Sequence, residues 1–151
     1  MKITEALLAE HLVFHHLLDH IEKSVPQIQS LGEIKSLSAL LASMLRAHSR
    51  AEMDLLFGPL GHCLEQIGQR EVFEDEHDEI DDSLVRVQET KRLPQARALL
   101  TAAVLASRKH FDKEERIVFP MAEEMLKLET LRELGDAWMH QRKEPASLTA
   151  K

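Results

Sequence analysis

The sequence has 151 residues, 44% hydrophobic and 30% charged, with few glycines and prolines, which favours one soluble all-α domain over residues 1–151. The formal net charge is -7, and lysines and arginines are scattered singly or in pairs, so we expect no nucleic-acid partner. Cys63 is the single cysteine, which excludes an intrachain disulfide and a thiolate metal cluster and indicates a reducing compartment.

The N-terminal stretch carries charged and histidine side chains where a signal peptide needs an apolar core. No uninterrupted apolar run approaches the roughly 18 to 20 residues that a membrane-spanning helix requires. We therefore expect a cytoplasmic protein with no membrane partner.

Four long helices are expected, and the first runs from Thr4, as its N-cap, to about Ser24. The stretch that contains Pro26 and Gly32 has the composition of a connection between helices. A second helix is predicted over about residues 33–57.

Glycines and a proline cluster in the stretch 58–68, which predicts a break in the helical pattern. A third helix is expected from about residue 66, or earlier, to about residue 91. A fourth is expected over about 94–119, since Pro94 is well placed in its first turn. Pro120 is expected to end or kink this fourth helix.

A shorter helical tail is predicted over about residues 123–142, and residues 143–151 are expected to fray. The apolar side chains of this tail can cap one end of a helical bundle or pair with a second copy in a homodimer. Capping is the preferred interpretation.

Apolar residues recur at alternating steps of four and three in the first and third helices, the spacing of a buried seam in an up-down-up-down four-helix bundle. One histidine interrupts each seam, which comprises Leu7, His11, Phe14, Leu18 and Ile21 in the first helix and Phe73, His77, Ile80, Leu84 and Val87 in the third. In the second and fourth helices a His-x-x-x-Glu pair occupies the seam, His48 with Glu52 and His110 with Glu114. We therefore predict a bundle over about residues 3–122 with these six polar side chains in its core.

The two halves of the chain resemble each other. Residues 47–57 align with residues 109–119, with a His, a Glu and a Phe at matching offsets, and the pair Glu-His at 10–11 aligns with the pair at 76–77. Such a repeat implies two helix pairs related by a pseudo-two-fold axis. It places four histidines and two glutamates at equivalent depths in one core.

Positions i and i+4 of a helix share one face about 6 Å apart, so each His-x-x-x-Glu pair offers a nitrogen and an oxygen donor to the same interior point. Two unpaired carboxylates in a core are costly, and no lysine or arginine occupies these seams. A metal cluster supplies the missing positive charge. The six donors suit two ions that share the carboxylates, with iron or manganese well matched and zinc or copper also accepted.

The first and third helices each carry a Glu-His pair. The second and fourth each carry a His-x-x-x-Glu pair, followed by a hydrophobic residue and a proline. This combination of motifs resembles the hemerythrin-like HHE cation-binding domain. The resemblance implies a di-iron centre whose nitrogen ligands are His11, His48, His77 and His110 and whose bridging carboxylates are Glu52 and Glu114. Members of that family bind dioxygen, sense oxygen or iron, or handle nitric oxide. We therefore expect a small diatomic ligand or an oxidant as the partner.

Three further side chains are candidate ligands or hydrogen-bond partners of ligands. His15 lies one turn after His11, and Asp81 stands where hemerythrins that carry oxygen have a fifth histidine. Glu115 lies at the +5 offset where those proteins place their carboxylate. Because of these two departures, the resemblance does not imply reversible oxygen carriage.

Three classes of function stay open on the sequence alone. The leading hypothesis is a non-heme di-iron binding protein that senses, stores or protects against oxygen, nitric oxide or iron stress. The second is an iron-dependent oxidoreductase that acts on peroxide, oxygen or nitric oxide, and the third is a structural bundle with adventitious metal. The sequence supplies no phosphate-binding loop and no activated nucleophile, so it does not decide whether the protein is an enzyme.

Overall fold

The computed structural model describes residues 1–144, and within this range every regular element is helical, without a strand. The α-helices are α1 (Ile3–Ser24), α2 (Leu31–Glu52), α3 (Gly58–Gln66), α4 (Arg70–Glu89), α5 (Leu93–Lys113), α6 (Phe119–Met125) and α7 (Leu128–Lys143). A 3₁₀ turn, η1 (Val25–Gln27), follows α1, and two π-helical turns, η2 (Met53–Phe57) and η3 (Glu114–Val118), continue α2 and α5. The all-helical prediction is confirmed.

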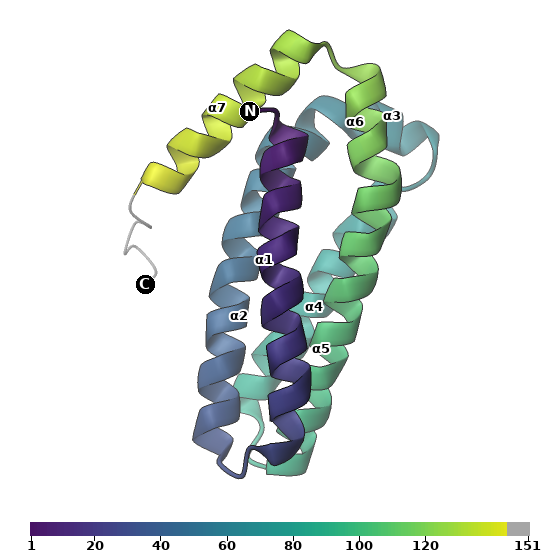
Figure 1. Ribbon diagram of the computed structural model, residues 1–151. Helices are drawn as coiled ribbons and strands as arrows, with labels where there is room; N and C mark the ends of the chain where they lie inside the picture. The colour runs from purple at the N-terminus through teal and green to yellow at the C-terminus, as the bar shows by residue number, and fades with distance from the viewer. Residues whose placement is uncertain (145–151) are drawn as a thin grey trace.

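The four long helices α1, α2, α4 and α5 lie side by side, with α3, α6 and α7 gathered toward one end (Figure 1). Helix α4 packs against α5 and α2, and α1 packs against α5 and α7. The buried faces form two apolar clusters at different levels of the bundle. The larger cluster lies toward the α1–α2 connection and includes Leu18, Leu41 and Leu84, whereas the smaller lies toward α3 and α6 and includes Leu60 and Phe73.

The start of α1 differs from the prediction. Thr4 is buried inside the first turn, and its hydroxyl donates to Glu123 of α6, so it is not the N-cap. The N-cap is Lys2, whose backbone N–H donates to Glu5 Oε2 at 2.9 Å. Thr4 therefore ties α1 to α6 instead of capping its own helix.

The predicted break over residues 58–68 is wrong, because most of this stretch forms α3. Pro59 lies in the first turn of α3, where a missing N–H removes no hydrogen bond. The chain turns after α3 at Gly68. This glycine has a φ of 68°, the one positive φ among the described residues, and a residue without a Cβ adopts it readily. Helix α4 consequently begins at Arg70, somewhat later than the sequence predicted.

Pro120 does not end the fourth long helix, which continues through η3 and α6 to Met125. Phe119 N–H donates to the carbonyl of Glu114, five residues back, and closes the π turn. A wider turn relieves the clash that a proline ring makes with the carbonyl four residues before it. The expected end of the helix at Pro120 is therefore wrong, because a π turn precedes the proline instead of regular α-helical geometry, and the alternative of a kink stays a prediction.

Helix α7 folds back along α1 rather than extending the bundle (Figure 1). Leu131 is buried in the smaller cluster, and a Cβ added to Gly135 would meet the backbone of Met1, so α7 and the start of α1 are in close contact. Helix α7 therefore packs on α1 within the same chain, and the choice between capping and homodimer pairing stays a prediction. Of the predicted frayed segment 143–151, residues 145–151 lie outside the described residues.

None of the helices within residues 1–144 combines the length and the apolar character that crossing a bilayer requires.

Candidate metal centre

A layer of six polar side chains separates the two apolar clusters. The side chains of five of these residues are almost fully buried, with exposed fractions of 0% to 2%, and that of His77 is 13% exposed. Helices α1, α2, α4 and α5 each supply one histidine at the seam position that the spacing predicts. The six residues, hereafter the polar layer, are His11, His48, Glu52, His77, His110 and Glu114.

Both glutamates of the polar layer stand at π-helical turns. Glu52 is the last residue of α2, directly before η2, and Glu114 is the first residue of η3. A π turn accommodates an extra residue and often occurs at a functional site. At the end of the second π turn the buried position is Val118, whereas Ile117, which continues the regular seam spacing, is only half-buried.

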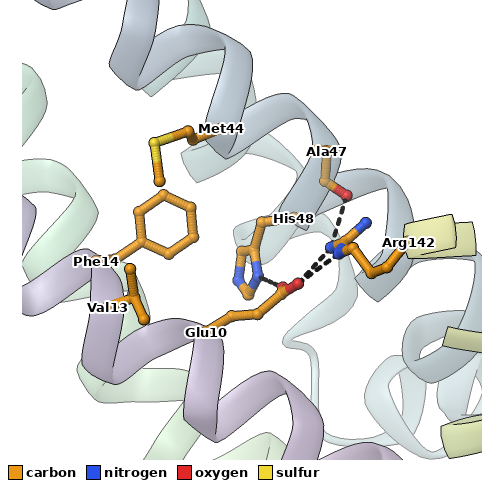
Figure 2. Close-up of a pocket in the computed structure, with 7 residues that line it drawn as sticks. All are labelled: Glu10, Val13, Phe14, Met44, Ala47, His48 and Arg142. Atoms are coloured by element: carbon orange, nitrogen blue, oxygen red, sulfur yellow. Dashed lines mark hydrogen bonds and ion pairs between the residues drawn. The ribbon is translucent and has the colours of Figure 1, made fainter. Parts of the chain in front are cut away.

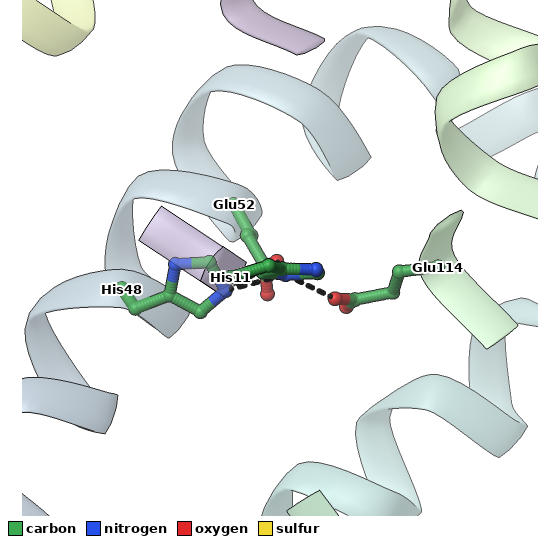
Figure 3. Close-up of side chains that lie close together, drawn as sticks. All are labelled: His11, His48, Glu52 and Glu114. Atoms are coloured by element: carbon green, nitrogen blue, oxygen red, sulfur yellow. Dashed lines mark hydrogen bonds and ion pairs between the residues drawn. The ribbon is translucent and has the colours of Figure 1, made fainter. Parts of the chain in front are cut away.

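Four members of the polar layer form a first group of donors, drawn in Figure 3: His11, His48, Glu52 and Glu114. His48 Nε2 lies 2.8 Å from Glu52 Oε1 and 3.1 Å from His11 Nε2. His11 Nε2 in turn lies 3.2 Å from Glu114 Oε2 and 3.6 Å from Glu52 Oε1. Donors bonded at about 2.0 to 2.2 Å to a first-row ion such as zinc stand roughly 2.8 to 3.6 Å apart, so these spacings match a coordination shell.

The second group of donors contains the same two glutamates together with His77 and His110. His110 Nε2 lies 2.8 Å from Glu114 Oε1, and His77 Nε2 lies 3.4 Å from Glu52 Oε2. Each glutamate therefore directs one oxygen toward each histidine pair. Glu52 uses Oε1 toward His48 and Oε2 toward His77, and Glu114 uses Oε2 toward His11 and Oε1 toward His110.

The charge and hydrogen bonding of the polar layer fit metal ions. Within residues 1–144, no lysine or arginine nitrogen lies within ion-pair distance of Glu52 or Glu114. In the same range both oxygens of each glutamate are buried without a partner in hydrogen-bond geometry, although histidine nitrogens approach to 2.8 Å. Lone pairs that converge on a common point instead of on a neighbouring hydrogen are what metal ligands present.

Residues 2–122 match the family model of the hemerythrin HHE cation binding domain. The chain belongs to this family. No curated protein and no solved structure matched the chain in the parallel comparisons. The matched range contains the whole polar layer and stops inside α6, so α7 lies beyond the part that the family model describes. Cation binding is thus the property that this HHE domain shares with its family.

In the metal-free HHE domain the glutamates favour protonated histidines. Burial lowers the pKa of His11 and His48, but nearby carboxylates outweigh burial: Glu114 and Glu52 raise the pKa of His11 to about 9, and Glu52 and Glu10 raise that of His48 to about 10. Burial likewise raises the pKa of the Glu52 carboxyl, but the surrounding histidines outweigh it and hold this pKa well below its usual range. A metal ion that binds here must displace protons from the histidine nitrogens.

Three carboxylates outside the polar layer contact the Nδ1 atoms of its histidines. The pairs are Glu10 Oε2 with His48 at 2.6 Å, Glu115 Oε1 with His11 at 2.9 Å, and Glu76 Oε2 with His110 at 3.3 Å. Because a carboxylate only accepts, each of these Nδ1 atoms donates, which leaves Nε2 free to face the interior. A ligand histidine held in this way has its tautomer and its ring orientation fixed.

Glu10 is itself held by α7. Trp138 Nε1 donates to Glu10 Oε1 at 3.0 Å, and Arg142 approaches the same oxygen with Nε and Nη2, both at 2.6 Å. Figure 2 shows Glu10 between His48 and Arg142, and these three side chains line, together with Phe14, a cavity of about 250 Å³. The last turns of α7 therefore reach the polar layer through a single intervening carboxylate.

The structure places the three additional candidates outside both donor groups. Glu115 lies behind His11, at its Nδ1 atom, and His15 Nε2 is 3.3 Å from the same glutamate oxygen. Asp81 is exposed and lines a small hollow beside His77.

Sequence reasoning assigned no role to Glu10 and Glu76. The signal was present, because each directly precedes a histidine of the polar layer in the repeated Glu-His pair. Neighbouring residues on a helix point in different directions, so each glutamate contacts the histidine of an adjacent helix rather than its own neighbour.

Proposed function

We propose that the protein is a non-heme di-iron protein in which α1, α2, α4 and α5 form an up-down-up-down bundle around the two ions, and that residues 1–151 are one HHE domain. In this proposal His11 and His48 bind one ion, His77 and His110 bind the other, and Glu52 and Glu114 bridge them. The observation that carries it is the orientation of the two glutamates, each with one oxygen toward each histidine pair. A carboxylate that served a single ion would have no reason to span both pairs.

Iron is proposed because imidazole and carboxylate donors suit it and because di-iron carboxylate sites are built in the cores of helical bundles. Manganese and zinc accept the same donors, so the identity of the metal is the first quantity to measure. The two bridging carboxylates also offset the charge of two adjacent cations, which lone histidines do not.

We infer that the centre meets a small diatomic ligand such as oxygen or nitric oxide, or an oxidant, and that the protein senses, stores or protects against these or against iron stress. When bound, the ions supply coordination positions that the side chains leave open, together with a change of oxidation state. The chain supplies an apolar wall: the Phe111 ring centroid is 4.2 Å from that of His11, and the Phe14 ring centroid is 5.2 Å from that of His48. Such walls control solvent access and the polarity around the ions.

The test is a measurement of iron, manganese and zinc per chain on protein made without an affinity tag, with ultraviolet-visible spectra in air and after dithionite. His110→Ala removes a donor, and His62→Ala, at an exposed position of α3, is the matched control. We expect about two irons per chain, as in other di-iron bundles, and charge-transfer bands that disappear on reduction and in His110→Ala but persist in His62→Ala.

Fewer than about 0.2 metal ions per chain after anaerobic reconstitution with ferrous iron would refute the proposal, because a folding-coupled site binds its metal far more completely. Two manganese or zinc ions with no iron would keep the binuclear site and refute the choice of iron.

A further inference from the structure

The two donor groups are related by the internal repeat, so each residue in one group has a counterpart in the other. Aligning the halves pairs His11 with His77, His48 with His110, and Glu52 with Glu114. The geometry follows the pairing: both His-x-x-x-Glu contacts measure 2.8 Å, and the histidine rings of each group lie 4.9 and 4.4 Å apart. A residue that differs between the two sequence repeats therefore marks a difference between the two donor groups.

The largest departure concerns the carboxylate behind the α1 and α4 histidines. Glu115, which follows the bridging Glu114, holds His11 at Nδ1. Its counterpart in the first half is Met53, which follows Glu52 and is an exposed thioether on η2. Within residues 1–144, the Nδ1 atom of His77 has no hydrogen-bond partner, and the position that aligns with Glu115 in the repeat carries a methionine, which cannot accept a strong hydrogen bond from it.

The two groups also differ in the exposure of their histidines and in the distances of the remaining carboxylate–Nδ1 contacts. The His11 side chain is fully buried, whereas that of His77 is 13% exposed. Glu10, which is fixed by α7, holds His48 at 2.6 Å, whereas Glu76 holds His110 at 3.3 Å. Both comparisons favour the group that contains His11 and His48.

We infer that the two metal positions are unequal: the His11–His48 position binds the first ion, and the His77–His110 position binds the second ion more weakly because no carboxylate in the described range contacts the Nδ1 atom of His77 as Glu115 contacts that of His11. The inference rests on the proposed binuclear site and adds the order of loading. Glu115 is a positioning residue that acts through His11. Loss of such a contact behind a ligand histidine lowers metal affinity about 10- to 100-fold. We therefore expect the dissociation constants of the first and the second ion to differ by this factor.

The experiment is an anaerobic calorimetric titration of the metal-free full-length protein with ferrous iron. We expect two separable steps whose dissociation constants differ about 10- to 100-fold. His77→Ala should abolish the weak step and leave the tight step unchanged, whereas His11→Ala should abolish the tight step.

Met53→Glu supplies the missing carboxylate at a position that is 37% exposed, so the fold accommodates the charge, and Met53→Leu is its matched control. Met53→Glu should lower the dissociation constant of the second ion and bring it closer to that of the first, and Met53→Leu should leave both unchanged. Glu115→Gln should weaken the first step alone.

The outcomes separate the two proposals. No binding of ferrous iron in any variant would refute the proposed function itself. Two ions that bind in one unresolved step, or a tight step that disappears in His77→Ala and survives in His11→Ala, would leave the binuclear site standing and overturn the order of loading. A Met53→Glu titration identical to that of Met53→Leu would overturn the assignment of the difference to the missing carboxylate.

Discussion

Glu10→Ala tests whether the carboxylate between α7 and His48 stabilises the fold as the structure indicates. The substitution removes the acceptor for three donors, the His48 imidazole, the Trp138 indole and the Arg142 guanidinium. It leaves the buried His48 Nδ1 without a partner and detaches the end of α7 from α1. The metal-free protein is the right state to measure, since bound ions would obscure the loss.

The size of the effect follows from the burial of each contact. Hydrogen bonds to a charged group contribute about 1.5 to 3 kcal/mol, and exposed ion pairs contribute at most about 1 kcal/mol. The Glu10 side chain is 17% exposed and that of Arg142 27%. The buried contact with His48 should therefore contribute about 1.5 to 3 kcal/mol, and the contact with Arg142 at most about 1 kcal/mol. With the Trp138 bond intermediate, we expect the free energy of unfolding to fall by about 3 kcal/mol.

Urea denaturation followed by fluorescence measures this directly, because Trp138 is the single tryptophan and the sequence contains no tyrosine. Glu10→Ala should lower the denaturation midpoint and shift the native emission of Trp138 to longer wavelength. Glu22→Ala, on the same helix and paired with Arg108 at the surface, is the matched control and should lose less than about 1 kcal/mol. A Glu10→Ala protein as stable as Glu22→Ala, with unchanged tryptophan emission, would refute the reasoning.

Three further predictions concern the metal-free protein. The pKa values of His11 and His48 are raised to about 9 and about 10 in the folded state, above the roughly 6.5 of an unfolded histidine, so their stabilisation is complete below pH 6.5 and is lost as the pH rises through 9 to 10. Denaturation midpoints should therefore fall across that interval, and a midpoint independent of pH would contradict the assignment. Gly135→Ala places a Cβ against the backbone of Met1, and thermal denaturation should show a loss of about 1 to 3 kcal/mol, as for other overpacked contacts. Ser38 is fully buried, and its hydroxyl lacks a hydrogen-bond partner within residues 1–144, so Ser38→Ala should stabilise the protein by about 1 kcal/mol in urea denaturation; a loss of stability would contradict this prediction.

The long helices could be predicted because their seams combine hydrophobic periodicity with the absence of breakers. The errors fall at Pro59 and Pro120, where the sequence shows a helix breaker and the structure shows a proline in a first turn. In both cases a π-helical turn precedes the proline, and an isolated sequence carries no reliable sign of a π turn. Thr4 was misread for a related reason, since its hydroxyl found a tertiary partner that local capping rules do not anticipate.

The polar layer was predictable because a charged or imidazole side chain in an apolar seam conflicts with burial unless something balances it. Its six members come together in the structure, and their binding of metal stays a prediction. Among the residues behind the histidines, Glu115 was already a candidate because of its place in the family pattern, whereas Glu10 and Glu76 lie at half-buried positions that look like solvated helix faces in the sequence. Their partners depend on the rotation of neighbouring helices. The cytoplasmic location also stays a prediction.

The polar layer also bears on how the bundle comes apart. Because it lies between the larger and the smaller apolar clusters, the helices of residues 1–144 share no continuous apolar core, and ionised groups connect the two ends of the bundle when metal is absent. Regions joined by few apolar contacts open separately, as local unfolding measured by hydrogen exchange shows in many proteins. The end that carries α3, α6 and α7 should therefore open on its own in the metal-free state, and coordination would join both halves into one cooperative unit. Under metal starvation, that end is where proteolysis of this chain should begin.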